Sequence, residues 1–190
     1  MSKIPSGNAF LNPQSVLNAI GIHLGDKVAD FGCGGAAYFV LQAAKMVGSR
    51  GIVYGVDVLK PALSGLKSRL ELHNITNVVP VWSNVETYGA TRRIRSNSLT
   101  VGMIINTLFQ AQDKTAMIRE AERMVAPGGR LVIIDWKTGG LPFGPTQKQL
   151  VVPETIQAMA EKFHLKLTDV FEPGKYHFGL IFTKAETHPA

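Results

Sequence analysis

The sequence contains little that would tie the chain to a membrane or to an oxidising compartment. Its 190 residues include one cysteine, Cys33, so no internal disulfide can form, and we expect a reducing location, the cytoplasm. No apolar run reaches membrane-spanning length, and the first residues lack the apolar core of a secretion signal. Internal repeats, low-complexity tracts and linkers are also missing, which predicts a single domain over residues 1–190, with residues 1–12 as an irregular arm.

Charge gives only a modest indication of partners. Charged residues make up 18% of the chain and apolar residues 45%, which excludes a disordered protein and favours a globular one. The formal charge of +6 favours anionic partners. The only tight basic cluster, Arg92-Arg93-Ile94-Arg95, has no aromatic residues between its arginines, so we interpret it as a solvated loop and rank an RNA contact second.

The apolar pattern alternates between strand and helix along most of the chain, which predicts an α/β fold with a doubly wound, mostly parallel sheet covered on both faces. The last forty residues differ, since two consecutive strands separated by a turn at 172–175 predict an antiparallel hairpin and a seven-stranded sheet. Residues 83–97 are polar and irregular, with room for one short helix. The predicted strands are residues 28–31, 52–57, 78–81, 99–105, 131–134, 165–171 and 176–183, and the predicted helices are 13–20, 39–47, 61–73, 116–125 and 153–163.

The motif around which the chain is organised lies at residues 28–57. Its first strand runs into a glycine-rich turn, Gly32-Cys33-Gly34-Gly35-Ala36-Ala37, and its second strand ends in the carboxylate of Asp57. Glycines let the backbone approach a ligand closely, and an acid at the end of the second strand accepts hydrogen bonds from ribose hydroxyls. The motif therefore predicts a cofactor of the adenosine type.

Together with Pro127-Gly128-Gly129-Arg130 and the terminal hairpin, this motif resembles the class I S-adenosylmethionine-dependent methyltransferases over about residues 10–182. Within that family the chain is similar to the ubiquinone/menaquinone-biosynthesis C-methyltransferase-like (methyltransferase type 11) group. The resemblance implies a Rossmann-like fold, S-adenosylmethionine as cofactor and S-adenosylhomocysteine as product. The stretches that carry the similarity to the group are Ala9-Phe10-Leu11-Asn12-Pro13, Asp135-Trp136-Lys137, Phe143-Gly144-Pro145 and Tyr176-His177-Phe178-Gly179-Leu180.

The resemblance gives roles to the residues of the glycine turn and of the strands beside it. It implies that Asp30 orients the methionine ammonium of the cofactor, that Gly32 and Gly34 approach its ribose and methionine portions, and that Asp57 holds both ribose hydroxyls. Cys33 belongs to the same loop, where we interpret it as a small packing residue. Asp30 and Asp57 also fit a simpler interpretation as acids that form turns or cap helices.

Four further residues are implied at the adenine and methyl ends of the cofactor. Val58 would pack on the adenine face, and Val85 lies in the segment after the third strand. In that segment Asn84 replaces the acid that the family uses to accept a hydrogen bond from the adenine amine, although an asparagine there is equally expected as a turn residue. Asn106 ends the fourth strand, at the edge that faces the transferred methyl group.

The sequence does not single out a catalytic base. Methyl transfer is an in-line displacement that depends on proximity and alignment, and a base is needed only where the acceptor must lose a proton. Candidates at the expected edge are Asp135, Lys137, Tyr176 and His177, although His177 also fits a polar strand residue satisfied by its neighbours. We expect the arm through Leu11 and residues 139–152 to form a lid over the acceptor.

We therefore predict transfer of a methyl group to a small-molecule acceptor, with a quinone precursor as one option, and we assign no metal site. RNA methylation and a non-catalytic protein that binds S-adenosylmethionine are the alternatives. A dinucleotide-dependent oxidoreductase ranks lower, because the turn lacks the last glycine of the usual spacing and the terminal hairpin disagrees. Arsenic methylation is rejected, because it depends on several cysteines.

Overall fold

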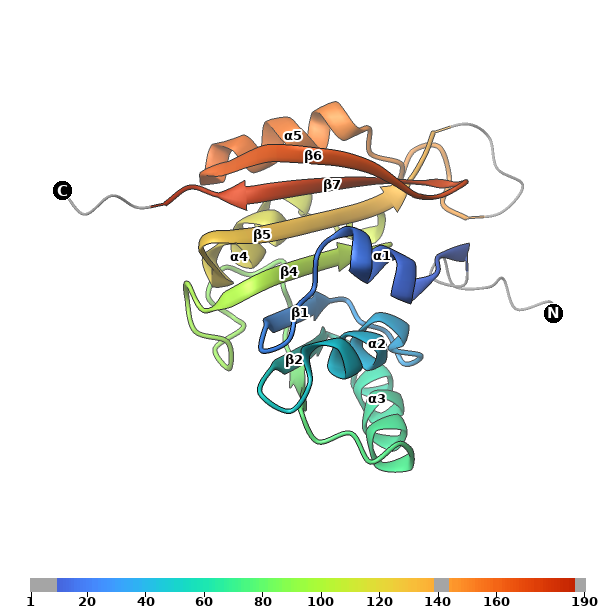
Figure 1. The fold of residues 1–190 in the computed structure, drawn as a ribbon. Coiled ribbons are helices and arrows are strands. Elements are labelled where there is room, and N and C mark those ends of the chain that lie inside the picture. Colours follow the sequence, from blue (N-terminus) through green and yellow to red (C-terminus); the bar gives the residue numbers. More distant parts are fainter. Residues whose placement is uncertain (1–9, 139–143, 187–190) are drawn as a thin grey trace.

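The computed structural model describes residues 10–138 and 144–186, and these form a seven-stranded sheet of order β3-β2-β1-β4-β5-β7-β6 (Figure 1). The first five strands pair in parallel, whereas β7 runs antiparallel to both β5 and β6. This confirms the predicted doubly wound α/β sheet with a C-terminal hairpin. The strands are β1 (Lys27–Phe31), β2 (Ile52–Asp57), β3 (Val78–Trp82), β4 (Leu99–Ile105), β5 (Val125–Trp136), β6 (Leu165–Gly174) and β7 (His177–Lys184).

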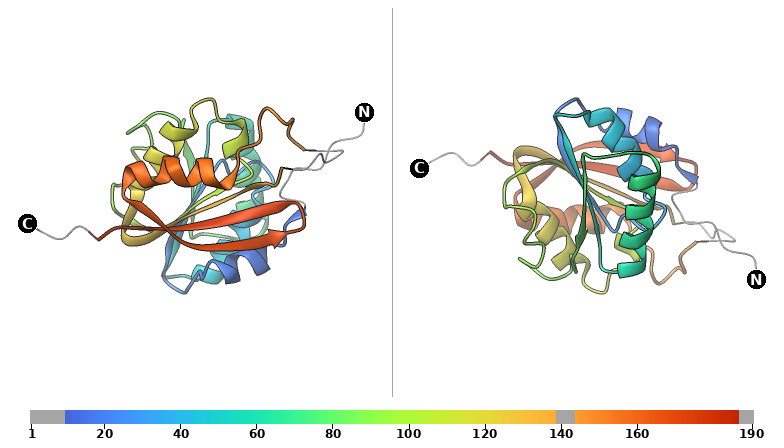
Figure 2. Two further views of the ribbon diagram at one scale, coloured as in Figure 1. Left: turned by 90° about the horizontal axis from the view of Figure 1, so that it is seen from above. Right: turned by 90° about the horizontal axis from the view of Figure 1, so that it is seen from below.

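Helices cover both faces of the sheet, with α1, α2 and α3 on one side and α4 and α5 on the other (Figure 2). Successive side chains of a strand point to opposite faces, so Val132 and Ile134 of β5 pack toward α1–α3, while Leu131 and Ile133 pack toward α4 and α5. The helices are α1 (Pro13–Ala19), α2 (Tyr38–Val47), α3 (Lys60–Leu72), α4 (Lys114–Met124) and α5 (Pro153–Ala160), with short 3₁₀ helices η2 (Leu108–Gln110) and η3 (Glu161–Phe163).

The strand order places a topological switch point between β1 and β4, because the chain proceeds outward from β1 in one direction and from β4 in the other. In open α/β sheets, ligands bind beyond the carboxyl ends of the strands at such a point. The carboxyl ends of β4 and β5 point to the right in Figure 1. The fold itself therefore indicates where a functional site should lie.

The largest departure from the predicted elements concerns β5. We expected a helix ending at Pro127-Gly128-Gly129 and a strand from Leu131 to Ile134, bounded by Asp135. Instead α4 ends at Met124 and β5 begins at once, with Val125 paired to Leu99 and a bulge before the regular register. Gly128 adopts a positive φ of 73°, and a Cβ on Gly129 would lie 2.9 Å from the Leu99 carbonyl oxygen. The glycines thus allow a close bulge within the strand.

Two smaller predictions were also wrong. No helix forms within residues 83–97, and β6 continues to Gly174, so the hairpin turns at Lys175 and Tyr176 and not over residues 172–175. The register of the hairpin shifts between Phe171 and Gly174, which a regular strand pattern does not reveal. In the described part of the chain, no helix is both long and apolar enough to cross a membrane.

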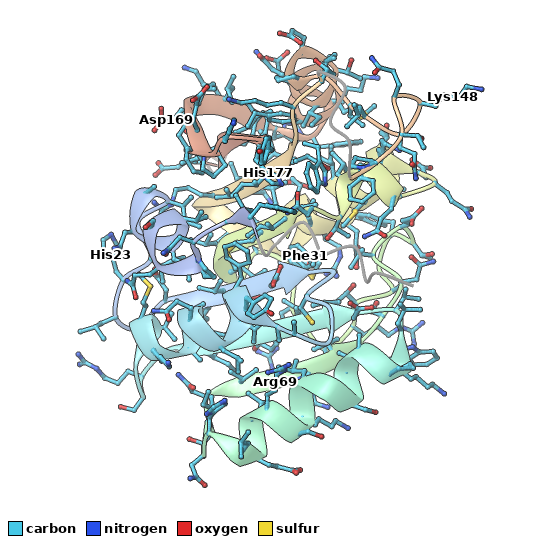
Figure 3. All side chains as sticks on the ribbon, turned by 90° about the vertical axis from the view of Figure 1, so that its right-hand side faces the viewer. His23, Phe31, Arg69, Lys148, Asp169 and His177 are labelled. Carbon is cyan, nitrogen blue, oxygen red and sulfur yellow. The ribbon has the colours of Figure 1, made fainter. Side chains whose placement is uncertain are left out.

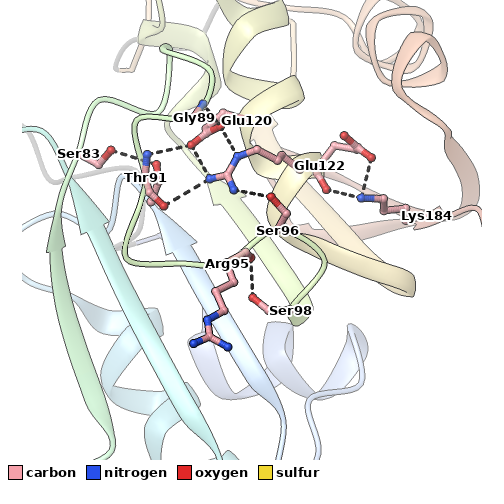
Figure 4. A network of polar contacts seen from close by, with 10 residues as sticks. Ser83, Gly89, Thr91, Arg95, Ser96, Ser98, Glu120, Glu122 and Lys184 are labelled. Carbon is pink, nitrogen blue, oxygen red and sulfur yellow. Dashed lines mark hydrogen bonds and ion pairs between the residues drawn. The ribbon is translucent and has the colours of Figure 1, made fainter.

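The irregular segment between β3 and β4 is held in place by a buried ion pair on α4 (Figure 4). Glu120, which is fully buried, accepts hydrogen bonds from the backbone of Gly89 at 2.7 Å and of Thr91 at 3.0 Å. Arg123 donates to Glu120 at 2.8 Å and to Ser96 at 2.9 Å. Burial alone would raise the pKa of Glu120, but these donors outweigh burial and hold that pKa below its ordinary value, so the carboxylate stays ionised.

The Arg123→Met variant should be less stable by about 3 kcal/mol at pH 7, because removing one partner leaves the Glu120 charge buried and unpaired. Urea unfolding followed by circular dichroism measures this loss. Arg119→Met is the matched control, since Arg119 is exposed on the same helix and stacks over the ring of Tyr88 at 4.4 Å. A loss at position 123 no larger than the loss at position 119 would contradict this account of the segment.

Candidate functional site

A cleft of about 460 Å³ lies at the carboxyl ends of β1, β2 and β3. The turn after β1 contributes Gly32 and Gly34, the end of β2 contributes Asp57 and Val58, and the segment after β3 contributes Asn84 and Val85. These are six of the nine cofactor residues predicted from the sequence. The strand order therefore brings together three segments that are well separated in the chain.

A second cleft of about 460 Å³ lies at the opposite end of the sheet, between the end of α2 and the connection from α3 to β3. It is lined by Gly48 and Asn77, among others, and the side-chain amide of Asn77 donates to the carbonyls of Ala44 at 2.8 Å and Gly48 at 2.9 Å. None of the predicted site residues lines it. The cleft at the carboxyl ends is thus the candidate site.

The glycine turn is shaped by two residues that only glycine fits without strain. Gly32 has a φ of 85°, and a Cβ there would lie 2.3 Å from the Cγ2 atom of Thr107 at the end of β4. Gly34 has a φ of 63° and nothing within 4 Å of the position of a Cβ. Ala37, at the end of the turn, also adopts a left-handed backbone conformation, with a φ of 49°. The turn therefore packs closely on β4 at Gly32 and leaves Gly34 open toward the cleft.

Asp57 fixes the geometry of this turn. One carboxylate oxygen accepts the backbone N–H of Gly34 at 2.9 Å, and the other accepts the backbone N–H of Leu59 at 2.9 Å. The second bond spans two residues and forms the turn before α3, whose N-cap is Leu59, so Asp57 acts as a turn-forming acid and does not cap the helix. Each carboxylate oxygen retains further acceptor capacity, so Asp57 can hold the turn and a ligand hydroxyl together.

Asp30 and Cys33 are buried beside the cleft and do not line it. Burial, and then the charge of Asp57, raise the pKa of Asp30 to about 7. Burial and the two carboxylates also raise the pKa of the Cys33 thiol, which therefore stays protonated. The sulfur lies against the backbone of β2, since a Cβ on Gly55 would be 3.3 Å from it. This supports the interpretation of Cys33 as a packing residue.

The remaining predicted residues occupy different surroundings. The Asn84 side-chain oxygen accepts the backbone N–H of Glu86 at 2.9 Å, which is the turn role that the sequence left open. Val58 is half exposed, and its carbonyl accepts the indole N–H of Trp82 at 2.9 Å. Asn106 is buried after β4 with a left-handed φ of 52°, and its backbone N–H donates to Ile134.

Sequence reasoning missed the wall of the cleft that faces Val58. This wall comes from the end of β4, from η2 and from α4. The helix η2 has three residues, too few for any periodic signal, so only the preceding turn at Asn106 pointed to it. The lining residues that the sequence did not predict include Glu86, Thr107, Gln110, Ala111 and Met117.

None of the four catalytic candidates lines the cleft. The carboxylate of Asp135, which is buried, accepts the backbone N–H groups of Phe109 and Trp136, both at 2.9 Å. Burial raises its pKa to about 6, although the two amides and Lys114 act in the opposite direction. Asp135 thereby holds η2, and with it the far wall of the cleft. Lys137 forms an ion pair with Glu172 at 2.7 Å.

His177 and Tyr176 belong to an aromatic cluster near the carboxyl end of β5. The ring of Trp136 lies 4.4 Å from that of His177 and 6.1 Å from that of Phe10, which in turn lies 5.9 Å from Tyr176. Figure 3 looks onto this side of the molecule and labels His177. Both ring nitrogens of His177 are buried without a hydrogen-bond partner in the described part of the chain. Burial and then Lys137 lower its pKa to about 4, so the imidazole is neutral.

The charge of the cleft favours a cationic ligand. Asp57 and Glu86 line it, whereas no lysine or arginine does so in the part of the chain that the structure describes. A dinucleotide carries a doubly charged pyrophosphate, which these carboxylates would repel. S-Adenosylmethionine carries an ammonium and a sulfonium group, which they would attract.

With this geometry established, comparison with known proteins identifies the family. The sequence pattern of a family described as a methyltransferase domain matches residues 22–184. The chain belongs to this family. The methyltransferase is also 28% identical over 135 residues to aklanonic acid methyltransferase DauC of Streptomyces sp. (strain C5), in an alignment that covers 70% of the chain and 59% of DauC. The chain thus spans about three fifths of the length of this relative.

Solved structures give the same assignment. A SAM dependent methyltransferase from Aquifex aeolicus superimposes with a TM-score of 0.83 and 25% identity, covering 94% of this chain and 92% of the other. A putative type 11 methyltransferase from Sulfolobus solfataricus gives a TM-score of 0.74 with 21% identity, over 95% and 96% of the two chains, and supports the fold. The chain therefore contains a class I S-adenosylmethionine-dependent methyltransferase domain. The acidic cleft and the open glycine cradle at Gly34 fit this cofactor.

The His177→Leu variant should depend less on pH for its stability than the wild type. The pKa of His177 is about 4 in the folded chain and about 6.5 in the unfolded chain. Between these pH values the unfolded chain binds a proton that the folded chain does not bind. Wild-type stability therefore falls as pH drops through this window. Between pH 7.5 and 4.5 the wild type should lose about 2 kcal/mol more than the variant. Urea unfolding at both pH values measures the difference, with His23→Gln, an exposed site, as control. Equal losses in wild type and His177→Leu would contradict the buried neutral imidazole.

Proposed function

We propose that the methyltransferase transfers a methyl group to a small aromatic acceptor of the quinone-precursor kind. The observation that carries this proposal is the aromatic cluster of Phe10, Trp136 and Tyr176 near the carboxyl end of β5, next to the strand that ends beside the cleft. Aromatic side chains offer a planar acceptor favourable ring contacts. The name of the relative DauC, an aklanonic acid methyltransferase, is consistent with a small-molecule acceptor.

The proposed roles of the cofactor residues follow from the cleft. When bound, S-adenosylmethionine supplies the activated methyl group on its sulfonium. Asp57 would accept hydrogen bonds from the ribose hydroxyls, and Gly34 leaves room for the cofactor to approach the backbone. Val58 and Val85 would pack against the base, with Asn84 near its amino edge. Asp30, which is buried beside the cleft, would attract the positive charge of the methionine portion.

On the acceptor side we assign alignment and exclusion of water to the protein, and no base. Asp135 is bonded to two amides and Lys137 to Glu172, which fits positioning roles better than proton transfer. The two ring nitrogens of His177 form no hydrogen bond with the described residues, but the ring is buried against Trp136. The proposed lid includes residues 1–9 and 139–143, which lie outside the described residues.

An RNA acceptor is the second candidate, and one observation ranks it lower. Arg92, Arg93 and Arg95 are exposed around a buried Ile94, in the segment that leads into the amino end of β4. The cleft lies at the carboxyl ends of the strands. A basic surface at the opposite end of the strand would not guide RNA to the transferred methyl group.

The Asp57→Ala variant should bind S-adenosylhomocysteine on the order of 100-fold more weakly than the wild type, because each hydrogen bond to a carboxylate contributes about 1.5–3 kcal/mol. Isothermal titration calorimetry with S-adenosylhomocysteine and with NADH measures this. Asp169→Asn is the control, since Asp169 is exposed on β6 (Figure 3). Tight NADH binding without a response to S-adenosylhomocysteine would contradict the cofactor assignment.

The acceptor class is tested separately, by release of S-adenosylhomocysteine in the presence of hydroxylated aromatic acids, quinone precursors, aliphatic metabolites and RNA. Turnover with the aromatic compounds that Trp136→Ala reduces through a higher KM would support the proposal. Turnover with RNA alone, at a rate that falls steeply with added salt, would overturn it in favour of the second candidate.

A further inference from the structure

Two carboxylates lie close together beneath the glycine turn, and they are not equivalent. Asp30 is near the end of β1 and pairs in register with Gly55 of β2, two residues before Asp57. Asp57 accepts two backbone amides, from Gly34 and Leu59. Asp30 is 2% exposed, and no hydrogen bond from the described residues offsets the burial of its carboxylate. Burial and the nearby charge of Asp57 therefore favour the neutral form of the Asp30 carboxyl group in the free protein.

No positive charge compensates this pair. In the part of the chain that the structure describes, no lysine, arginine or histidine forms an ion pair with Asp30 or Asp57. The strand on the other side of β1 places Met103 beside Asp30, and the buried side chains of α2 are apolar. The remaining titratable neighbour is Cys33, whose thiol stays protonated. Among the described residues, Asp57 is the charged group that acts on Asp30, and it acts by repulsion.

Asp135 shows what hydrogen bonds do for a carboxylate of similar burial. It is 1% exposed, yet two backbone amides bind its oxygens and Lys114 lies near enough to act on it, so its pKa rises only to about 6. Asp30 lacks these donors and faces a second carboxylate, and its pKa reaches about 7. The negative charge of an ionised Asp30 therefore stays uncompensated until a cation binds in the adjacent cleft.

We propose that the methyltransferase takes up its cofactor in exchange for a proton: Asp30 is protonated in a substantial share of the free enzyme, and the positive charge of the methionine portion displaces that proton to the solvent. The O–H bond of the Asp30 carboxyl group breaks, the buffer accepts the proton, and the carboxylate remains beside the cleft that holds the ammonium group. This inference rests on the proposed contact between Asp30 and the cofactor. A nearby opposite charge favours an ionised carboxylate, so binding and ionisation support each other.

The proton count on binding is the direct measurement. Calorimetric titration with S-adenosylhomocysteine, which carries the ammonium group, is repeated in phosphate and imidazole buffers, which both buffer near pH 7 and differ in ionisation enthalpy. The dependence of the observed enthalpy on buffer should give about 0.5 proton released at pH 7, about 0.9 at pH 6 and about 0.1 at pH 8. Affinity should be about tenfold lower at pH 6 than at pH 8, if Asp30 stays ionised in the complex.

Two controls assign the proton to Asp30 and to the ammonium. Asp30→Asn should release no proton at any of these pH values, whereas Asp26→Asn should match the wild type, because Asp26 precedes β1 at the opposite end of the strand. 5′-Methylthioadenosine has the same base, sugar and thioether but no ammonium group. It should bind the wild type without releasing a proton.

Binding of S-adenosylhomocysteine without proton release at pH 6 and 7 would overturn the proposal and leave the cofactor assignment intact. Release of the same number of protons by Asp30→Asn would also overturn it. Failure of the wild type to bind S-adenosylhomocysteine would overturn the cofactor assignment as well. Should Asp30→Asn not bind, ¹³C NMR of the Asp30 carboxyl carbon in the free wild type decides: a titration midpoint near pH 7 supports the proposal, and one near pH 4 overturns it.

Discussion

The site depends on the hydrogen bond from the backbone N–H of Gly34 to the carboxylate of Asp57. It joins the end of β2 to the turn that follows β1, and the same carboxylate holds Leu59 at the start of α3. The turn can come this close only because Gly32 and Gly34 adopt left-handed backbone conformations. One side chain thus sets the position of the cradle and is also the group best placed to bind a ribose.

Several features near the site disfavour folding, and the rest of the fold offsets them. Asp30 is a buried carboxyl group without a donor, Ala37 and Asn106 hold left-handed backbone without being glycine, and His177 buries two ring nitrogens. Each of these features disfavours folding by itself. Two apolar clusters, one on each face of the sheet, and the Glu120–Arg123 pair offset them. Such unfavourable features concentrate at the edge of the sheet where the ligand would bind, as expected of a functional site.

The sequence was sufficient for the parts of the molecule whose signals are local. The glycine turn and Asp57 lie within thirty residues, and alternating strands and helices define a doubly wound sheet. The far wall of the cleft could not be predicted in this way, because η2 is short and owes its position to Asp135 of β5. The early start of β5 depends on the pairing of Val125 with Leu99, a tertiary contact that overrides the helix-ending signal of Pro127 and its glycines. The charge states of Asp30 and Glu120 are equally invisible to local pattern, because they depend on burial and on charges and donors from segments that are distant in the chain.

A single structure can test whether the nucleoside binds at the carboxyl ends of β1 and β2 with its sugar held by Asp57. A crystal structure of the methyltransferase grown with S-adenosylhomocysteine measures this directly. We predict both ribose hydroxyls within hydrogen-bond distance of the Asp57 carboxylate, with the bond from Gly34 preserved. A nucleoside found in the cleft beside Gly48 and Asn77, or an Asp57 side chain turned away from the sugar, would contradict the account.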